Sequence, residues 1–258
     1  MDALLEVSGL RLSFGGLQVL HGLDLAVGKA AIASLIGPNG AGKTSVFNCL
    51  TGFYRPSGGS IRLAGKSING LAPHRITRLG MARTFQNLRL FRELTAAENV
   101  MAGRHCRTRA GALDAIFETP LHRREERAIR AAAERWLAFV GIPEASAQMA
   151  GTLPYGHQRR LEWARALATE PSLLLLDEPA AGLNSGEKLE LVSLVRRVRD
   201  ELGISVLLIE HDMGLVMQVS EHIAVLDYGR KIAEGNAAEV QSNPRVIEAY
   251  LGREEDAL

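Results

Sequence analysis

The residues with the clearest chemical potential form a glycine-rich run near the start of the chain. The run reads Gly37-Pro38-Asn39-Gly40-Ala41-Gly42-Lys43-Thr44, followed by Ser45, and it matches the phosphate-loop pattern G-x-x-x-x-G-K-[ST]. Glycine lets a backbone wrap closely around phosphates, so that successive N–H groups face their oxygens. Lys43 would neutralise the β- and γ-phosphates, and the Thr44 hydroxyl would ligate Mg²⁺. The run predicts a nucleoside triphosphate site, although a chance glycine-rich turn is the alternative.

Two acidic residues end an apolar run in the second half of the chain. Residues 173–176 are all leucine, and Asp177 and Glu178 follow them. A buried strand delivers carboxylates at its C-terminal end, where α/β sheets bind ligands. We expect Asp177 to hold Mg²⁺ through water and Glu178 to activate or orient the attacking water. We expect this strand to neighbour the phosphate-loop strand; by itself, such a pair could equally be a helix cap or a solvated pair.

A histidine follows the next apolar run, residues 204–209. If that strand lies beside the strand that ends at Asp177, His211 would sit near the γ-phosphate. There it could donate a hydrogen bond and hold the water and Glu178 in register. An ordinary surface or packed histidine is the alternative.

The elements that would position these residues are predicted from hydrophobic patterning. Alternation at the start of the chain predicts two or three short antiparallel strands. Residues 57–59 predict a turn, and the last helix is expected to follow Asn243-Pro244 and end near Leu251. Strands alternating with helices after Pro171 predict a parallel sheet with crossover helices. The expected strands are 31–36, 60–63, 173–176, 204–209 and 223–226, and the expected helices are 44–50, 187–202 and 213–219.

The middle of the chain has a different pattern. Residues 95–165 carry few strand signals, and residues 122–140 have a helical period with a solvated face. Residues 104–120 have weak periodicity and support no assignment. We therefore expect one domain over residues 1–258, with an α/β core at 1–94 and 166–258 and an inserted helical subdomain at about 95–165.

Composition excludes several other classes of protein. Lys and Arg number 30 against 29 Asp and Glu, and the formal net charge of +1 does not indicate a nucleic-acid partner. Cys49 and Cys106 cannot form a disulfide framework, and no Cys/His spacing indicates a zinc finger. The N-terminus does not resemble a secretion signal, and no apolar run reaches about 18 residues. We expect any membrane role to come through a partner.

Taken in order, these residues resemble the ATP-binding cassette family over essentially the whole chain. The resemblance implies an α/β fold with a P-loop NTPase core and mixed sheet, an N-terminal antiparallel β-subdomain and an inserted α-helical subdomain. Phe14 matches the position of the family's adenine-stacking aromatic, although it could instead be a core residue. Gln86, in Arg83-Thr84-Phe85-Gln86, resembles the glutamine that senses Mg²⁺ and the attacking water; a generic surface glutamine is the alternative.

The family signature Leu-Ser-Gly-Gly-Gln appears in altered form. The corresponding segment is Leu153-Pro154-Tyr155-Gly156-His157, in which only Leu153 and Gly156 match. In the family this loop opens a helix and caps the γ-phosphate held by the opposite subunit. Pro154 supplies neither a hydroxyl nor an N–H, whereas the Gly156 N–H and the helix N-terminus could still bind phosphate. We hypothesise that this signature serves its opposing site poorly, so that the working complex is asymmetric.

A second departure follows the acidic pair. Ala181-Gly182-Leu183-Asn184 resembles a loop in which the family often has Ser-Ala-Leu-Asp. Asn184 keeps hydrogen-bonding capacity but loses the charge. The resemblance therefore predicts altered coupling between the two ATP sites.

The finer resemblance is to the cytoplasmic ATPases of branched-chain amino-acid importers. It is carried by residues 14–17, 47–56, 155–162, 226–235 and 243–252. It implies a peripheral ATPase on the cytoplasmic face of the membrane, paired with a second ABC ATPase subunit as a hetero- or homodimer. It also implies two transmembrane permease subunits and, indirectly, an extracytoplasmic substrate-binding protein. A permease helix would dock near residues 86–91, where Leu88, Leu90 and Phe91 are either an apolar surface or ordinary core.

Three other functions stay open at this point. The first is the ATPase of a different importer, or of a lipid or solute exporter, which shares the same cassette chemistry. The second is a soluble cassette ATPase without a membrane partner; the spacing of the motifs leaves no room for a long coiled coil. The third is an ATP sensor that does not hydrolyse, against which Glu178 argues.

Overall fold

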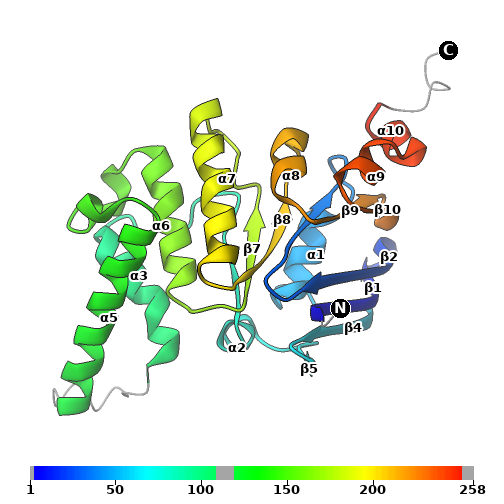
Figure 1. The fold of residues 1–258 in the computed structure, drawn as a ribbon. Helices are drawn as coiled ribbons and strands as arrows, with labels where there is room; N and C mark the ends of the chain where they lie inside the picture. Colours follow the sequence, from blue (N-terminus) through cyan, green and yellow to red (C-terminus); the bar gives the residue numbers. More distant parts are fainter. Residues whose placement is uncertain (1–2, 109–118, 252–258) are drawn as a thin grey trace.

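A computed structural model describes residues 3–108 and 119–251 and contains two β-sheets (Figure 1). The smaller sheet is antiparallel, with the order β2-β1-β4-β5. Its strands are β1 (Ala3–Phe14), β2 (Leu17–Gly28), β4 (Gly58–Leu63) and β5 (Lys66–Ser67). The antiparallel N-terminal sheet is confirmed, but it opens with two long strands rather than two or three short ones.

The turn expected at residues 57–59 is wrong, because Gly58 and Gly59 already belong to β4. The register between β1 and β4 shifts between Ser8 and Arg11, as it does at a β-bulge. Gly59 has φ +87°, and a Cβ there would lie 2.4 Å from the Gly9 carbonyl oxygen. Gly9 and Gly59 thus let β4 pass closely over β1. In the sequence alone, the glycines at 58 and 59 predict a turn instead.

The larger sheet has the order β10-β9-β3-β8-β7-β6. Its strands are β3 (Ile32–Ile36), β6 (Met81–Arg83), β7 (Leu173–Asp177), β8 (Ser205–Ile209), β9 (His222–Asp227) and β10 (Arg230–Gly235). All neighbouring pairs are parallel except β9 and β10, so the sheet is mixed, as expected. The expectation that the acidic strand neighbours the phosphate-loop strand is wrong, because β8 lies between β3 and β7.

The helices of the core follow the expected crossovers closely. Residues 213–219 form a helix as expected, and the helix expected over residues 187–202 begins two residues earlier. The helix after the phosphate loop begins at Lys43, and the last one follows Asn243 and ends at Leu251. The helices of the core are α1 (Lys43–Leu50), α2 (Pro73–Arg78), α7 (Ser185–Asp200), α8 (Met213–Val219), α9 (Ala237–Gln241) and α10 (Pro244–Leu251). Of these, the short helices α2 and α9 were not expected from the sequence.

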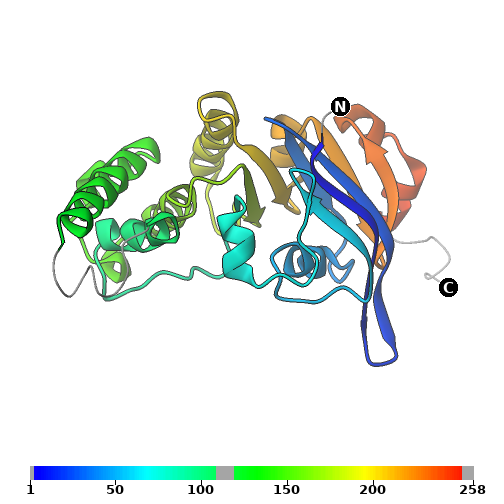
Figure 2. The ribbon, with the colours of Figure 1, turned by 90° about the horizontal axis from the view of Figure 1, so that it is seen from below.

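Helices dominate the described residues between 96 and 167. They form α3 (Ala96–Arg104), α5 (Pro120–Phe139) and α6 (Tyr155–Leu167), with short 3-10 turns at His105–Arg107, Pro143–Ala145 and Ala150–Thr152. Figures 1 and 2 show α3, α5 and α6 together at one end of the molecule, with the small sheet at the other. Of the unassigned segment 104–120, residues 109–118 lie outside the described part. Within the described residues, no helix has both the length and the apolarity needed to cross a bilayer.

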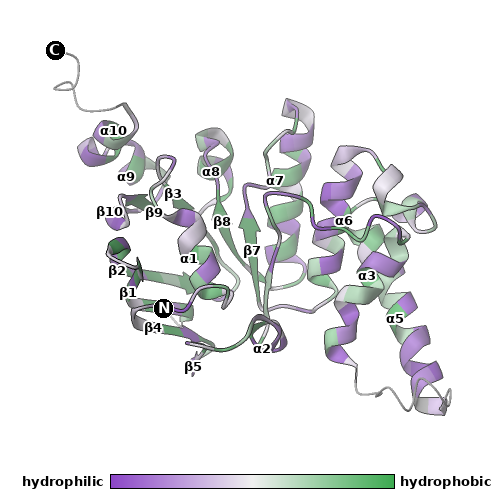
Figure 3. Ribbon diagram, turned by 180° about the vertical axis from the view of Figure 1, so that it is seen from behind, coloured by the Kyte–Doolittle hydropathy of each residue, from purple (hydrophilic) through white to green (hydrophobic). Residues whose placement is uncertain are grey.

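Two hydrophobic cores lie on opposite faces of the large sheet. Side chains alternate along a strand, so Leu174 and Leu176 join the core beneath α6, α7 and α8, whereas Leu173 and Leu175 face α1 and the small sheet. Figure 3 shows apolar residues along the strands and polar residues on the outward helical surfaces. Burial on both faces makes these strands continuous apolar runs. It also leaves only their C-terminal ends free for chemistry.

Candidate functional site

The phosphate loop joins β3 to α1, as the sequence predicts. Its first residue, Gly37, has φ +149°, and a Cβ there would lie 2.0 Å from the carbonyl oxygen of Leu226 on β9. Only glycine fits this approach. Gly42 precedes α1 in a left-handed conformation and supplies no side-chain cap. The first N–H groups of α1 therefore remain available to an anion.

Lys43 lies inside the loop that precedes it. Its Nζ donates hydrogen bonds to the carbonyl oxygens of Gly37 at 2.7 Å and Pro38 at 2.9 Å. Burial lowers the pKa of Lys43 from its ordinary 10.5, and the carboxylates of Glu178 and Asp177 partly oppose this shift. The acids from β7 thus act on the phosphate-loop lysine although β8 separates their strands. A buried cation at a helix N-terminus suits a polyphosphate.

Three predicted catalytic residues meet immediately after β7. Gln86 Nε2 donates a hydrogen bond to Glu178 Oε2 at 2.7 Å. His211 follows β8, the neighbour of β7, and its Nδ1 lies 3.8 Å from the same oxygen. Glu178 has φ +47°, a left-handed conformation that is costly for a residue other than glycine. Its N–H donates to the Ile209 carbonyl at 2.9 Å, which ties this bend to β8.

Asp177 is buried and paired with an arginine that sequence reasoning quoted without giving it a role. Arg83 Nη2 donates to Asp177 Oδ2 at 2.6 Å, and Arg83 Nη1 donates to Asn48 Oδ1 at 2.7 Å. Arg83 ends β6, which pairs with β7 in parallel. The sequence contained no signal for this pairing, because it predicted no strand at residues 81–83. The guanidinium links α1, β6 and β7.

A second residue missed by sequence reasoning is the acid Glu210, which is fully buried immediately after β8. Its carboxylate accepts hydrogen bonds from the N–H groups of Ala180 at 2.7 Å, His211 at 3.0 Å and Asp212 at 3.3 Å. Buried carboxylates need such partners. Glu210 thus holds the segment after Glu178 against the segment that carries His211. An acid directly before His211, at the end of an apolar strand, was the only signal in the sequence.

The residues expected to hold Mg²⁺ fit that ion chemically. The Asp177 carboxylate, the Thr44 hydroxyl and the Gln86 amide oxygen are oxygen donors, which Mg²⁺ prefers. Thr44 is exposed in the first turn of α1, next to Lys43. Arg83 binds the Oδ2 atom of Asp177. If Mg²⁺ binds here, the Oδ1 atom of Asp177 would be the oxygen that holds a water of the ion.

Phe14 lies at the end of β1, before the hairpin turn that Figure 2 shows projecting from the body of the molecule. Its side chain is 48% exposed, which argues against the alternative of a core aromatic. The Tyr54 ring meets it edge-on, with centroids 5.1 Å apart. The pair offers aromatic surface on which a base could stack.

The signature segment opens α6. Leu153 is buried, and Pro154 is the N-cap of the helix without any side-chain capping bond. Tyr155, Gly156 and His157 therefore form a first helical turn whose N–H groups lack a side-chain cap. The Tyr155 hydroxyl donates to the Ala181 carbonyl at 3.2 Å. The signature segment and the segment after Glu178 are thus in direct contact.

Asn184 has a structural role at the start of α7. Its Oδ1 accepts from the Glu187 N–H at 3.0 Å, and Glu187 Oε2 accepts from the Asn184 N–H at 2.9 Å. This reciprocal pair is a capping box. Asparagine caps helices as well as aspartate does, so the lost charge leaves this function intact.

Residues 20–181 match the family model described as ABC transporter, a span that contains the phosphate loop, Gln86, the signature segment and both acids. This chain belongs to the ABC transporter family. It is an ATPase of that family, and the resemblance seen in its motifs is confirmed. Residues 230–256 also match a model described as Branched-chain amino acid ATP-binding cassette transporter.

Several curated relatives cover almost the whole chain. The high-affinity branched-chain amino acid transport ATP-binding protein BraF of Pseudomonas aeruginosa is 52% identical, over 96% of this chain and 98% of its own length. The corresponding protein LivG of Escherichia coli K12 is 47% identical with the same coverage. Both relatives are named as ATP-binding proteins of branched-chain amino acid transport.

Solved structures confirm the fold class. The ADP conformation of an ATP-binding cassette of an ABC transporter superposes with a TM-score of 0.85 at 30% identity, covering 98% of this chain and 100% of that one. A nucleotide-free ATP-binding cassette superposes with a TM-score of 0.84 at 29% identity, covering 97% and 100%. The mixed sheet and helices described above are therefore those of an ABC ATPase.

Proposed function

We propose that the chain is the ATP-hydrolysing subunit of an importer of branched-chain or related amino acids. The observation that carries this proposal is the near-complete alignment with BraF and LivG, together with the C-terminal match at residues 230–256. The other cassette residues serve transporters of many substrates, so they support the ATPase and not the cargo. The amino-acid assignment therefore depends on relatives whose names state this transport.

In the proposed reaction, the backbone amides of residues 37–45 and Lys43 hold the phosphates of ATP, and Phe14 stacks on adenine. Mg²⁺, held by Thr44, Gln86 and water on Asp177, would neutralise charge on the phosphates. Glu178 orients the attacking water and accepts its proton, because its carboxylate lies at the end of β7.

Gln86 and His211 complete the proposed catalytic set. The 2.7 Å bond from Gln86 to Glu178 fixes the carboxylate, and His211 approaches the same oxygen. A hydrogen bond from His211 would hold the γ-phosphate and the water in register. Because Gln86 precedes residues 87–91, movement there would change the position of Glu178.

The chain is proposed to work as a pair of cassettes closing head-to-tail over two ATP molecules. The uncapped first turn of α6, residues 153–157, would meet the γ-phosphate held by a second ABC ATPase subunit in a hetero- or homodimer. Pro154 offers no hydroxyl there, which supports an asymmetric pair. Each chain would be one cassette, with a core at 1–94 and 166–258 and a helical subdomain at about 95–165.

The membrane partners are proposed to be two permease subunits, with an extracytoplasmic binding protein acting through them. The ATPase would then be peripheral on the cytoplasmic face. Phe91 is 55% exposed in the segment after Gln86, whereas Leu90 packs against the large core. Phe91 therefore suits a docking permease helix, and Leu90 is accounted for by core packing.

Transport assays test this proposal directly. The chain is co-expressed with its neighbouring permease and ATPase genes, reconstituted into liposomes with the binding protein, and supplied with ATP inside. We expect uptake of leucine, isoleucine or valine that stops when Lys43→Ala replaces the wild-type chain. Uptake of a different solute, or ATP-driven export, would overturn the assignment of cargo while leaving the ATPase intact.

A further inference from the structure

A hydroxyl and a guanidinium connect three segments around the proposed site. The Tyr155 hydroxyl, in the signature segment, donates to the Ala181 carbonyl at 3.2 Å. The oxygen of the Tyr155 hydroxyl also accepts hydrogen bonds from Arg159 Nε at 3.0 Å and from Arg159 Nη2 at 2.8 Å. The Tyr155 ring also packs against Gly182, where a Cβ would lie 3.3 Å from a ring carbon. Tyr155 thus joins α6 to the segment after Glu178.

Arg159 extends this connection to the segment that carries Gln86. It is 5% exposed, one turn after Tyr155 on α6. Its Nη1 donates to the Phe85 carbonyl at 3.1 Å, and its Nη2 donates to the Gln86 carbonyl at 2.8 Å. All three guanidinium nitrogens are therefore used. A planar guanidinium can serve several acceptors in fixed directions, which a lysine ammonium cannot do.

Gln86 closes the connection to the catalytic carboxylate. Arg159 holds its backbone carbonyl, and its side chain holds Glu178 at 2.7 Å. Glu162, one turn after Arg159, accepts from the Phe85 N–H at 3.3 Å. The segment before Gln86 is thus held by α6 through its N–H and its carbonyls. A displacement of the start of α6 would therefore pull on Gln86 and Ala181 together.

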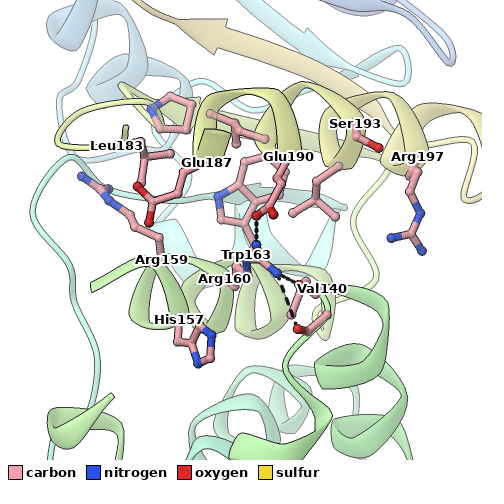
Figure 4. A pocket seen from close by; sticks show the side chains of 15 residues that line it. Val140, His157, Arg159, Arg160, Trp163, Leu183, Glu187, Glu190, Ser193 and Arg197 are labelled. Carbon is pink, nitrogen blue, oxygen red and sulfur yellow. Dashed lines mark hydrogen bonds and ion pairs between the residues drawn. The ribbon is translucent and has the colours of Figure 1, made fainter. Parts of the chain in front are cut away.

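The contact between α6 and α7 leaves room for such a displacement. A cavity of about 350 Å³ lies between them, lined by Gly156, Arg159, Trp163, Leu183 and Glu187, among others (Figure 4). In the figure, the Arg159 and Glu187 side chains extend from facing helices. The Arg160–Glu190 ion pair joins the two helices at this pocket, so α6 and α7 are held there by side chains and not by continuous close packing, which would resist a shift more strongly.

We propose that Tyr155 and Arg159 are a positioning pair that couples the signature segment to Gln86 and to residues 180–183. The inference rests on the proposed function, in which the signature meets nucleotide on the opposite subunit. Closure at Tyr155 then alters the position of Gln86 and, through it, of Glu178 in the same chain. The tyrosine that departs from the family signature supplies the hydroxyl at the centre of this coupling.

Hydrogen–deuterium exchange of the full-length chain tests the geometry without ATP turnover. Tyr155→Phe removes the shared hydroxyl, and we expect amide exchange to rise about tenfold in residues 84–91 and 179–183. Arg159→Lys should accelerate exchange in residues 84–91 by a similar factor, because lysine lacks the guanidinium that holds the Phe85 and Gln86 carbonyls. Tyr228→Phe and Arg62→Lys are controls at exposed positions, expected to match wild type.

The pattern of exchange decides the outcome. Acceleration confined to those two segments, with β3 and β8 unchanged, supports the positioning pair. Unchanged exchange in both segments, or acceleration spread equally over β3 and β8, overturns it. These results do not depend on the transported solute, so they remain informative if the amino-acid proposal fails.

A second measurement tests coupling in the assembled transporter. Tyr155→Phe should lower the Hill coefficient for ATP hydrolysis and kcat, with little change in KM, because the phosphate loop is intact. A wild-type Hill coefficient together with wild-type kcat would overturn the proposed coupling. A raised KM with unchanged kcat would also contradict it, because that result indicates a nucleotide-binding role.

Discussion

The phosphate-loop end and the signature end of this chain are built by different means. At the first, glycines, a helix N-terminus and strand ends place the ligand-facing groups, and Gly37 lies directly against β9. At the second, side chains on α6 make the contacts, and Tyr155 and Arg159 hold neighbouring segments. Backbone geometry strictly limits which residues fit, so the phosphate loop matches the family motif. Contacts between side chains can be made by other residues, so the signature segment can differ from the family motif.

The largest effect that we expect from a substitution is at the phosphate-loop end, on the acid that follows β7. Glu178→Gln keeps the shape of the side chain but removes the base, so ATP turnover should fall by about 100- to 10,000-fold. Nucleotide affinity should stay near wild type because the phosphate loop is unchanged. Steady-state ATPase assays of the assembled complex and equilibrium nucleotide binding measure the two quantities.

Glu6→Gln, at an exposed position on β1, is the matched control for that substitution. It should leave turnover unchanged. ATP-bound dimers should accumulate with Glu178→Gln alone, as seen by size-exclusion chromatography. Turnover within twofold of wild type in the Glu178→Gln complex would contradict the catalytic assignment.

Arg83→Met tests the ion pair that supports Asp177. The substitution leaves a buried carboxylate without its partner, so the free energy of unfolding should fall by about 3–5 kcal/mol. Urea denaturation followed by circular dichroism measures the loss. Arg62→Met, at an exposed position on β4, should cost little.

A double variant tests whether the loss of stability in Arg83→Met comes from the unpaired Asp177 carboxylate. Arg83→Met combined with Asp177→Asn should recover part of the stability, because the uncompensated charge is gone. If the double variant is less stable by the full sum of the two single losses, the two residues do not interact as the structure indicates.

Pro154→Ser restores a family residue at the signature end. Serine can cap α6 and should stabilise the chain by about 1 kcal/mol. Its hydroxyl should also raise ATP turnover in the assembled transporter by serving the opposite phosphate better. Pro154→Ala separates the two causes, since alanine removes the proline without supplying a hydroxyl. Unchanged turnover in Pro154→Ser, with the loop shown to close on nucleotide, would contradict the asymmetry hypothesis.

The smallest expected effect concerns Glu162, on α6. Burial raises the pKa of its carboxyl from the ordinary 4.5, and Glu162 Oε2 has no hydrogen-bond partner among the described residues. The folded state therefore binds this proton more tightly, so the contribution of Glu162 to stability is largest at low pH and is lost as the pH rises from 4.5 through the raised pKa.

Glu162→Gln removes this titration while keeping an oxygen that can accept from Phe85. The variant should gain stability relative to wild type as the pH rises from 4 to 7, by urea denaturation at each pH. Glu144→Gln, at an exposed position, is the matched control. A constant difference between Glu162→Gln and wild type across this range would show that Glu162 does not titrate as described.

Sequence reasoning was sufficient where backbone constraints act. The phosphate loop, the strands β3, β7, β8 and β9 and the helix over residues 213–219 follow from glycine spacing and apolar runs. It failed where distant segments meet: β8 separates β3 from β7, and the partners Arg83 and Asp177 are far apart in the chain. Glu210 could not be assigned for the same reason, because its acceptor role depends on the bend at Ala180. Such pairings are decided by tertiary packing.

Tyr155 shows the same limit at the signature end. Compared with the family motif, it is only a mismatch at a position where glycine is expected. Its hydroxyl gains significance because α6 and the segment around Ala181 lie side by side in the folded chain. Three-dimensional context thus converts an apparent defect in a motif into a specific contact.

The left-handed backbone at Glu178 has a consequence for engineering this protein. Glycine would adopt φ +47° without strain, so Glu178→Gly would relieve a conformational cost of about 1–2 kcal/mol at that residue. The same replacement would remove the carboxylate proposed to act as the base, so we expect it to end hydrolysis. A screen that rewards heat resistance alone would therefore favour inactive variants at this position, so thermostability and turnover must be selected together.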